Sequence, residues 1–366
     1  MIGGHSVRLL ICAGGTGGGV YPALAVHGVL TSKVTDVETL WVGGEGGMEE
    51  SLVRRQGIPF RSIPAAGVHG VNVTALPRNL LMLGRGVLAA RKILNDFKPN
   101  VLFFTGGYVA VPVALAGRSI PSLLYVPDIE PGIALKSLAG FADIIAVTTD
   151  QSQKFFNKSV YETGYPLRPD LALWDRQTAH QHLGISSKLP VLLVFGGSKG
   201  AHSINQAVLN NLKGLLAKFE IIHLCGDGDW QVVKSAREGL PMELAARYHA
   251  MSYLHEMGAA LAAADLVVSR AGASSLGEYP LFALPAVLVP YPHAWRYQKV
   301  NADYLTRRGA AIMLEDHRLN DDLLVTLNVL SENPNKLKAM RAAMFELSHP
   351  RAAEKIASAL IELAGE

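Results

Sequence analysis

The chain has 366 residues, more than a single hydrophobic core usually organises, so we expect two domains. Apolar residues make up 49% and charged residues 18% of the chain, which supplies sizeable cores and excludes extensive disorder. The formal net charge of +3 is mild, whereas a nucleic-acid-binding protein would carry a larger and clustered excess of basic residues.

Short apolar strands alternate with glycine-rich turns and helical patterns along the first half of the chain. The first strand runs into the turn GGTGGG at residues 14–19. In chain order, we expect strands over residues 7–13, 38–42, 101–104, 122–126 and 144–147, and helices over residues 20–31 and 48–56.

The same pattern restarts at Val191, and its first strand runs into the turn GGSKGA at residues 196–201. The expected strands are 191–195, 220–225, 266–269 and 286–289, and an amphipathic helix covers 352–363. Alternating strands and helices predict an α/β fold with parallel sheets and helices on both faces. We therefore predict two facing Rossmann-like domains with an interdomain cleft, over residues 1–163 and 164–348, and a C-terminal helix in 349–366 that packs back on the first domain.

Both glycine turns follow strands, and ligands of open α/β sheets bind beyond the carboxyl ends of the strands. Backbone N–H groups of these turns can approach a phosphate or a sugar closely. The first turn does not fit G-x-G-x-x-G, and the second strand ends in glycine where a dinucleotide enzyme has an acidic residue, which argues against an oxidoreductase. The second turn lacks the spacing of a P-loop.

Two later segments carry polar groups suited to a nucleotide sugar. The segment 269–278, SRAGASSLGE, follows a strand, and its glycine and serines can cap a helix and bind an anion. Glu278 is placed to accept the ribose hydroxyls, although a carboxylate in a first helical turn is also favoured by the helix dipole alone. The loop 290–302 supplies aromatic and polar side chains for a sugar.

An ordered series of motifs resembles the MurG family, bacterial transferases that add N-acetylglucosamine from UDP to lipid I in peptidoglycan synthesis. The motifs are GGTGG at 14–18, GGYV at 106–109, PG at 131–132, G-x-P-x-R at 164–168, GGS-x-GA at 196–201, AD-x-VVSRAGA-x-S-x-x-E at 264–278 and H-x-x-R-x-Q-x-x-NA at 293–302. The resemblance covers nearly the whole chain. It implies the GT-B glycosyltransferase architecture and an inverting transfer that needs neither a metal nor a cofactor besides the donor, UDP-N-acetylglucosamine.

The resemblance also implies the residues of the donor site. Arg168 and Ser198 would contact the diphosphate, Glu278 the ribose, and the backbone of Leu254 the uracil. The remaining donor residues are the first glycine turn (Thr16, Gly17, Gly18), the α-phosphate segment (Ala273, Ser274, Ser275) and Gln298 at the sugar. An arginine and helix N-termini can stabilise the charge that develops on a departing UDP.

The chain departs from the family on the acceptor side. Gly19 stands where the family has a histidine, the segment Tyr125–Asp128 replaces HEQN, and Tyr297 replaces the first of two glutamines. An inverting transfer needs a base near the acceptor hydroxyl. Asp128 and Glu130 are the local candidates, although both also fit ordinary carboxylates of a proline-rich loop, and His69 is a weaker one.

These departures leave three alternatives open beside transfer to a lipid-linked acceptor of the lipid I type. The first alternative is a paralogue with another acceptor or sugar. The second is a catalytically silent UDP-sugar binder, and the third and least favoured is an oxidoreductase.

Residues 76–92 combine apolar residues with Arg78, Arg85, Arg91 and Lys92, which fits contact with an anionic membrane surface and also a core helix with solvated basic ends. We expect neither a membrane-spanning segment nor a signal peptide.

Cys12 and Cys225 lie in apolar runs, so we expect no disulfide and a reducing compartment. The expected location is the cytoplasm, peripherally associated with the inner face of the cell membrane.

Overall fold

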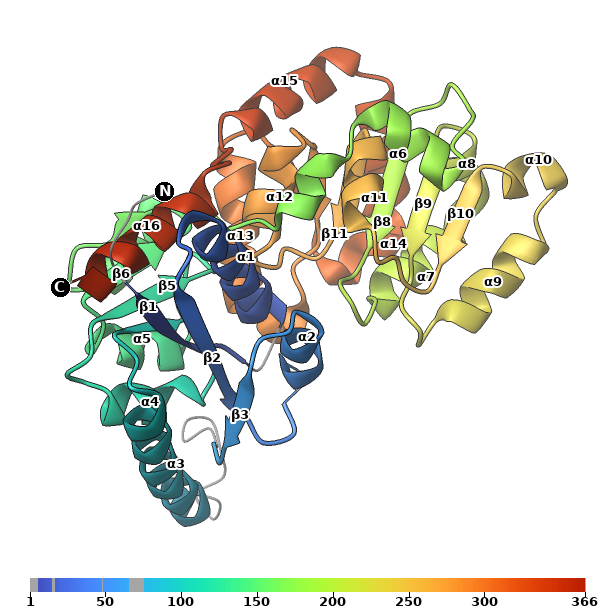
Figure 1. Cartoon of the computed structure of the whole chain (residues 1–366). Coiled ribbons are helices and arrows are strands. Elements are labelled where there is room, and N and C mark those ends of the chain that lie inside the picture. Colours follow the sequence, from blue (N-terminus) through green and yellow to red (C-terminus); the bar gives the residue numbers. More distant parts are fainter. Residues whose placement is uncertain (1–5, 15–16, 48, 66–75, 366) are drawn as a thin grey trace. The chain divides into compact units, whose positions relative to one another are not determined.

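The computed structural model describes residues 6–14, 17–47, 49–65 and 76–365. It consists of two compact units, which Figure 1 shows with their elements labelled. Unit 1 comprises Met1–Arg168 together with Pro350–Glu366, and unit 2 comprises Pro169–His349. Arg168 therefore belongs to unit 1, whereas the limits expected from the sequence place it in the second domain. The segment before it stays with unit 1 because Tyr165 packs edge-on against Tyr125, with ring centres 6.4 Å apart.

Unit 1 is built on a parallel sheet of seven strands in the order β3-β2-β1-β4-β5-β6-β7. The strands are β1 (Val7–Cys12), β2 (Val37–Gly44), β3 (Phe60–Ile63), β4 (Val101–Phe104), β5 (Ser122–Val126), β6 (Ile144–Val147) and β7 (Tyr161–Glu162). The helices are α1 (Gly17–Lys33), α2 (Glu49–Arg55), α3 (Leu76–Phe97), α4 (Ala110–Ala116), α5 (Ile133–Ala139) and α16 (Ala352–Gly365). Every residue of β4 and β5 is buried, as expected for strands covered by helices on both faces.

The last helix, α16, belongs to unit 1 although 181 residues of unit 2 separate it from Arg168. It packs against α1 and also contacts β1, β4 and β5, and Figure 1 shows α16 and α1 side by side. Its buried face includes Ile356, Leu360 and Leu363. Asn100 ties its end to the sheet, because the Asn100 side-chain amide donates to the carbonyl oxygens of Ser6 and Ala364.

Unit 2 repeats this plan with six parallel strands in the order β10-β9-β8-β11-β12-β13. The strands are β8 (Val191–Phe195), β9 (Glu220–Leu224), β10 (Tyr248–Met251), β11 (Leu266–Ser269), β12 (Ala286–Leu288) and β13 (Ala311–Met313). The helices are α6 (Arg176–Leu183), α7 (His202–Asn210), α8 (Leu212–Leu216), α9 (Trp230–Glu238), α10 (Met242–Ala245), α11 (Met257–Ala263), α12 (Ser275–Leu281), α13 (Trp295–Arg307), α14 (Leu319–Ser331) and α15 (Pro334–Phe345). The α/β fold of two Rossmann-like units is confirmed.

The strand order places a topological switch point in each sheet. In unit 1 the chain reverses direction across the sheet between β1 and β4, and in unit 2 between β8 and β11. In open α/β sheets, ligands bind at the carboxyl ends of the strands beside such a switch point. The two glycine turns follow β1 and β8, so each lies at the switch point of its own sheet.

Candidate active site

In unit 1, the loops after β1 and β4 pack backbone against backbone at the switch point. The hydroxyl of Thr105 donates to the carbonyl oxygen of Gly19 at 2.8 Å. Gly107 has φ of +87°, and a Cβ atom there would lie 2.8 Å from the carbonyl oxygen of Gly14. Glycine at position 107 thus satisfies both a left-handed conformation and a close approach.

A buried carboxylate, that of Glu49, packs against the first residue of the first glycine turn. Glu49, at the start of α2, is 2% exposed, and its Oε1 accepts the N–H of Gly44 at 3.0 Å. A Cβ atom at Gly14 would lie 2.5 Å from the same oxygen, and one at Gly43 would lie 2.9 Å from it. Burial and, second, the negative charge of Glu49 raise the pKa of the Cys12 thiol well above its usual range. These glycines therefore make room for Glu49, whatever the turn binds.

Gly19 leaves little space for the histidine of the family. A Cβ atom at position 19 would lie 3.1 Å from the carbonyl oxygen and 3.3 Å from the hydroxyl of Thr105. Gly17 and Gly18 begin α1, whereas Thr16 lies outside the described residues.

Arg168 lies beside α1 within unit 1. Its guanidinium carbon is 5.2 Å from the ring centre of Tyr21, one turn into α1. The aromatic face thereby holds a permanent cation near the helix that follows the first glycine turn.

The segment that replaces HEQN spans the end of β5 and the loop after it, and it is tightly hydrogen-bonded. The buried Tyr125 hydroxyl lies 2.7 Å from the Thr148 hydroxyl, which donates to the carbonyl oxygen of Pro127 at 2.8 Å. Burial, in the first place, raises the pKa of Tyr125 well above its usual range, and the charge of Asp128 adds to this shift. Asp128 is half-buried, and Glu130 is 5% exposed. Both candidate bases thus follow β5 at the carboxyl edge of the sheet, while His69 lies outside the described residues.

In unit 2, Arg270 connects the loops at the switch point, although it was not expected from the sequence as a site residue. Arg270 follows β11 and forms an ion pair with Asp316. Its second terminal nitrogen donates to the hydroxyl of Ser203 on α7 at 2.8 Å, and its guanidinium carbon lies 5.2 Å from the ring centre of Tyr291. The hydroxyl of Ser203 donates in turn to Asp316 at 2.7 Å. Arg270 thereby joins the segments that follow β8, β11, β12 and β13.

The segment after β11 forms a compact turn that leads into α12. The hydroxyl of Ser275 donates to the carbonyl oxygen of Gly272 at 2.6 Å. From the other side, the buried Asn301 of α13 donates its amide to the carbonyl oxygen of Ala271 at 3.1 Å. Ala273 and Ser274 lie within this turn, and Glu278 is half-buried in the first turn of α12.

Gln298 is oriented by the loop that precedes α13. The Tyr291 N–H donates to Oε1 of Gln298 at 2.8 Å. With its oxygen engaged, Gln298 presents its NH₂ group as the remaining polar group. A donor of this kind suits hydroxyl oxygens of a sugar.

The other expected donor residues of unit 2 lie at the same edge of its sheet. Ser198 is exposed in the glycine turn after β8, and Leu254 is half-buried three residues after β10. Ser198, Leu254, Glu278 and Gln298 therefore all follow strands of one sheet at the carboxyl edge. Arg270 and Asp316 join this edge, although neither was expected from the sequence as a site residue. Only Arg270 stood inside a motif that we quoted.

In the described parts of the chain, no three His, Cys, Asp or Glu side chains gather as metal ligands do. The two cysteines within those parts are free and buried.

Comparison with known proteins identifies the family. Residues 9–146 match the glycosyltransferase family 28 N-terminal domain, and residues 191–356 match the glycosyltransferase family 28 C-terminal domain. The chain belongs to glycosyltransferase family 28. The resemblance to MurG enzymes is confirmed by relatives that match nearly the full length.

Two relatives carry the name UDP-N-acetylglucosamine--N-acetylmuramyl-(pentapeptide) pyrophosphoryl-undecaprenol N-acetylglucosamine transferase. The protein from Roseiflexus sp. is 39% identical over 96% of this chain and 94% of its own length. The protein from Desulforudis audaxviator is 37% identical over 98% of this chain and 99% of its own. The crystal structure of Acinetobacter baumannii MurG superimposes with a TM-score of 0.79 and 25% identity, covering 97% of this chain and 99% of that one.

Proposed function

We propose that this family 28 glycosyltransferase transfers N-acetylglucosamine from UDP-N-acetylglucosamine to an N-acetylmuramyl-(pentapeptide) pyrophosphoryl-undecaprenol acceptor in peptidoglycan synthesis. The observation that carries the proposal is the match to relatives of that name over nearly the whole of both chains. The glycine turns at the switch points of both sheets support it, since nucleotides bind at such switch points.

The donor site of unit 2 is the carboxyl edge of its sheet. Glu278 accepts the ribose hydroxyls, and the Leu254 backbone contacts the uracil. The turn from Ala273 through Ser274 to Ser275 lies at the α-phosphate, Ser198 contacts the diphosphate, and Gln298 donates its amide to the sugar. The orientation of Gln298 by Tyr291 supports this last role.

From unit 1, the residues assigned to the donor are Thr16, Gly17, Gly18 and Arg168. The guanidinium of Arg168 binds phosphate oxygens, because a planar cation with several N–H donors matches them. When UDP departs, negative charge develops on its terminal phosphate, and this cation and the backbone N–H groups stabilise it without a metal ion.

The transfer step is a single displacement with inversion. The acceptor hydroxyl oxygen forms a bond to the anomeric carbon, and the bond from that carbon to the UDP oxygen breaks with its electron pair going to UDP. A carboxylate takes the hydroxyl proton. Asp128 and Glu130 are the proposed bases. Their place directly after β5 supports the proposal, since β5 ends at Val126, the position of the family's glutamate.

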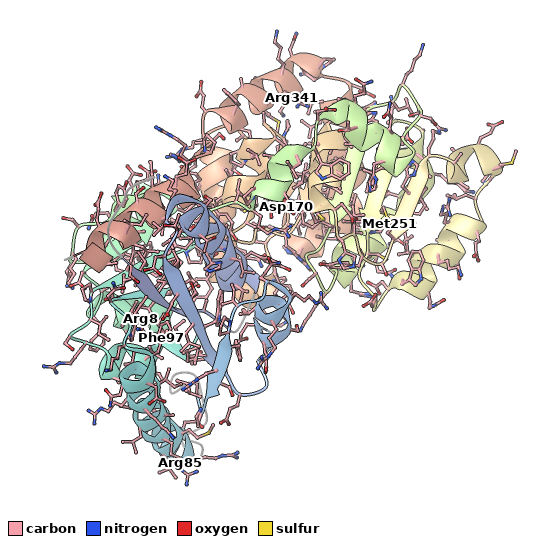
Figure 2. All side chains as sticks on the ribbon, in the orientation of Figure 1. Arg8, Arg85, Phe97, Asp170, Met251 and Arg341 are labelled. Carbon is pink, nitrogen blue, oxygen red and sulfur yellow. The ribbon has the colours of Figure 1, made fainter. Side chains whose placement is uncertain are left out.

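Contact with the membrane is proposed for α3. Leu81 and Leu88 of this helix are 58% and 66% exposed. Figure 2 labels Arg85 on the part of α3 that extends away from the sheet of unit 1. Apolar and cationic side chains on one helix fit the surface of anionic lipids at the cytoplasmic face, where the lipid-linked acceptor would be met. Among the described helices, none combines the length and apolar character needed to cross a bilayer.

A second candidate is transfer to a different acceptor by the same donor site. The close approach of Thr105 to Gly19 favours it, because the acceptor side has been rebuilt around a missing imidazole. Donor binding would be unaffected by this difference.

The deciding experiment is a matrix of UDP-sugars and acceptors with UDP release as the readout. We expect release with UDP-N-acetylglucosamine and the undecaprenyl-pyrophosphoryl-N-acetylmuramyl-pentapeptide. Release only with another lipid-linked acceptor would establish the second candidate, and UDP binding with no release from any pair would make the protein a silent binder.

A further inference from the structure

Below the second glycine turn, unit 2 contains a chain of buried polar side chains that the proposed transfer does not use. Tyr248 on β10, His223 on β9 and Asn205 on α7 are fully buried. Nδ1 of His223 lies 2.7 Å from the Tyr248 hydroxyl, and Nε2 lies 2.9 Å from Oδ1 of Asn205. The Asn205 amide donates to the Cys225 carbonyl oxygen at 2.8 Å and to Oδ2 of Asp229 at 2.7 Å.

The chemistry of the partners fixes the direction of every hydrogen bond. The amide nitrogen of Asn205 must face two acceptors, so its oxygen faces His223. His223 therefore carries its proton on Nε2, and its Nδ1 accepts from the Tyr248 hydroxyl. Burial lowers the pKa of His223 to about 4, which keeps the imidazole neutral and able to donate on one side and accept on the other.

The network ends where two loops interlock through their backbones. Gly200 and Gly226 have φ of +77° and +80°, and a Cβ atom on either would collide with the backbone of the other loop, at Cys225 and Lys199 respectively. The N–H groups of Cys225 and Gly226 donate to the carbonyl oxygens of Met251 and Ser252, each at 3.0 Å. The segments after β8, β9 and β10 are thus packed and hydrogen-bonded to one another. The Asn205 side chain binds the segment after β9 through the Cys225 carbonyl oxygen.

These three segments carry two of the residues assigned to the donor. Ser198 lies two residues before Gly200, and Leu254 lies two residues after Ser252. We propose that Asn205, supported by His223 and Tyr248, is a positioning residue that fixes the spacing between the diphosphate turn and the uracil loop. It thereby sets the affinity for the uridine diphosphate part of the donor. This inference rests on the proposed function of the same site.

The test reverses one hydrogen bond. Asn205→Asp replaces two N–H donors by a carboxylate that faces the Asp229 carboxylate and the Cys225 carbonyl oxygen. The double variant Asn205→Asp with Asp229→Asn restores a donor and an acceptor between these positions in the opposite sense. Asn210→Asp is the matched control, because it makes the same change on the same helix at an exposed site that bonds Asn320.

We expect Asn205→Asp to raise the Kd for UDP about tenfold in titration calorimetry, within the coupling range of contacting polar groups. The KM for the UDP-sugar should rise in parallel while kcat changes less. The double variant should recover only the part of the loss that arises at Asp229, because the Cys225 carbonyl oxygen still faces a carboxylate in it. If Asn205→Asp does not fold, His223→Gln, which keeps the donor to Asn205, should raise the Kd about threefold.

Wild-type affinity for UDP in Asn205→Asp, or in His223→Gln where only that variant folds, would overturn the positioning role. A wild-type protein that binds no UDP would instead overturn the proposed function, so the two failures are distinguishable.

Discussion

The guanidinium of Arg168 lies over the face of Tyr21, with 5.2 Å between the guanidinium carbon and the ring centre. The two residues are far apart in sequence, one from the first turns of α1 and the other from the segment after β7. A cation held over an aromatic ring gains about 0.5–2 kcal/mol, depending on its solvation. Tyr21 therefore limits the positions that Arg168 can occupy before any ligand arrives.

We predict that Arg168→Ala lowers kcat/KM about 10²–10³-fold, since one charged donor to the leaving group is removed. Tyr21→Leu should lower it less, because the cation remains but loses its support, and Tyr21→Phe should keep most of the activity. Steady-state UDP release measures all three. Arg118→Ala, an exposed arginine of the same unit, is the control, and full activity of Arg168→Ala would remove this residue from the mechanism.

We predict that Asp128→Asn or Glu130→Gln lowers kcat about 10²–10⁴-fold, the usual contribution of a general base, while the Kd for UDP stays near that of the wild type. The isosteric amides keep the shape of the loop and remove only the basic oxygen. Asp150→Asn is the control carboxylate on the exposed surface nearby. Unchanged turnover in both variants would require a base from elsewhere in the protein.

A third prediction concerns the first glycine turn. Gly14→Ala should lower the free energy of unfolding by about 1–3 kcal/mol, because its Cβ would press on the Glu49 carboxylate in a fully packed site. Gly28→Ala in α1 is the matched control, since no atom lies within 4 Å of its added Cβ. That change should raise the stability by about 0.5–1 kcal/mol through helix propensity. Urea denaturation checks both, and equal effects would contradict the crowding argument.

The buried imidazole of His223 predicts a loss of stability in acid. Its pKa is about 4 in the folded protein, below the 6.5 of an ordinary histidine, so the unfolded chain binds the proton more readily. The contribution of the neutral His223 side chain to the free energy of unfolding is therefore fully present above pH 6.5. About 3 kcal/mol of it is lost as the pH decreases to 4. The pKa of Asp229 is also lowered and adds to the loss at still lower pH. Unfolding of the wild type and of His223→Gln across this range should differ in slope, and parallel curves would refute the assignment.

Membrane contact through α3 makes a prediction about salt. The protein should sediment with anionic liposomes at low ionic strength and be released as salt screens the arginines. Exchanging Arg85 and Arg91 for glutamate should abolish binding, and Leu88→Asp should weaken it. Lys213→Glu, a charge reversal on an exposed residue of unit 2, should leave it unchanged. Absence of sedimentation with the wild type at low salt would exclude this role.

Most of the architecture was predictable because its strands are continuous apolar runs. The strands around Val7, Val101, Val191 and Leu266 were expected within a residue or so of their true ends. The strands that escaped prediction, β3, β7, β10 and β13, are the edge strands of the two sheets. All four are short, and β3, β7 and β10 also contain exposed or polar residues. Periodicity cannot separate such segments from loops.

The proposed roles of Arg168, Ser198 and Glu278 rest on the motifs of the family resemblance. The contacts of Arg270 could not be expected from the sequence, because Asp316 lies 46 residues further along the chain. Asn205 and His223 read as ordinary interior residues of a helix and a strand. Their hydrogen bonds arise only when β8, β9 and β10 are aligned in one sheet.

The hydrogen bond from Thr105 to the carbonyl oxygen of Gly19 constrains how this chain can change over evolutionary time. Any side chain at position 19 meets both the hydroxyl and the backbone of Thr105, so residue 105 must shift by a few tenths of an ångström to admit it. Any residue larger than glycine at position 19, histidine included, is therefore accommodated only if the backbone around residue 105 shifts as well. The tolerance of position 19 to substitution is thus set by the loop after β4.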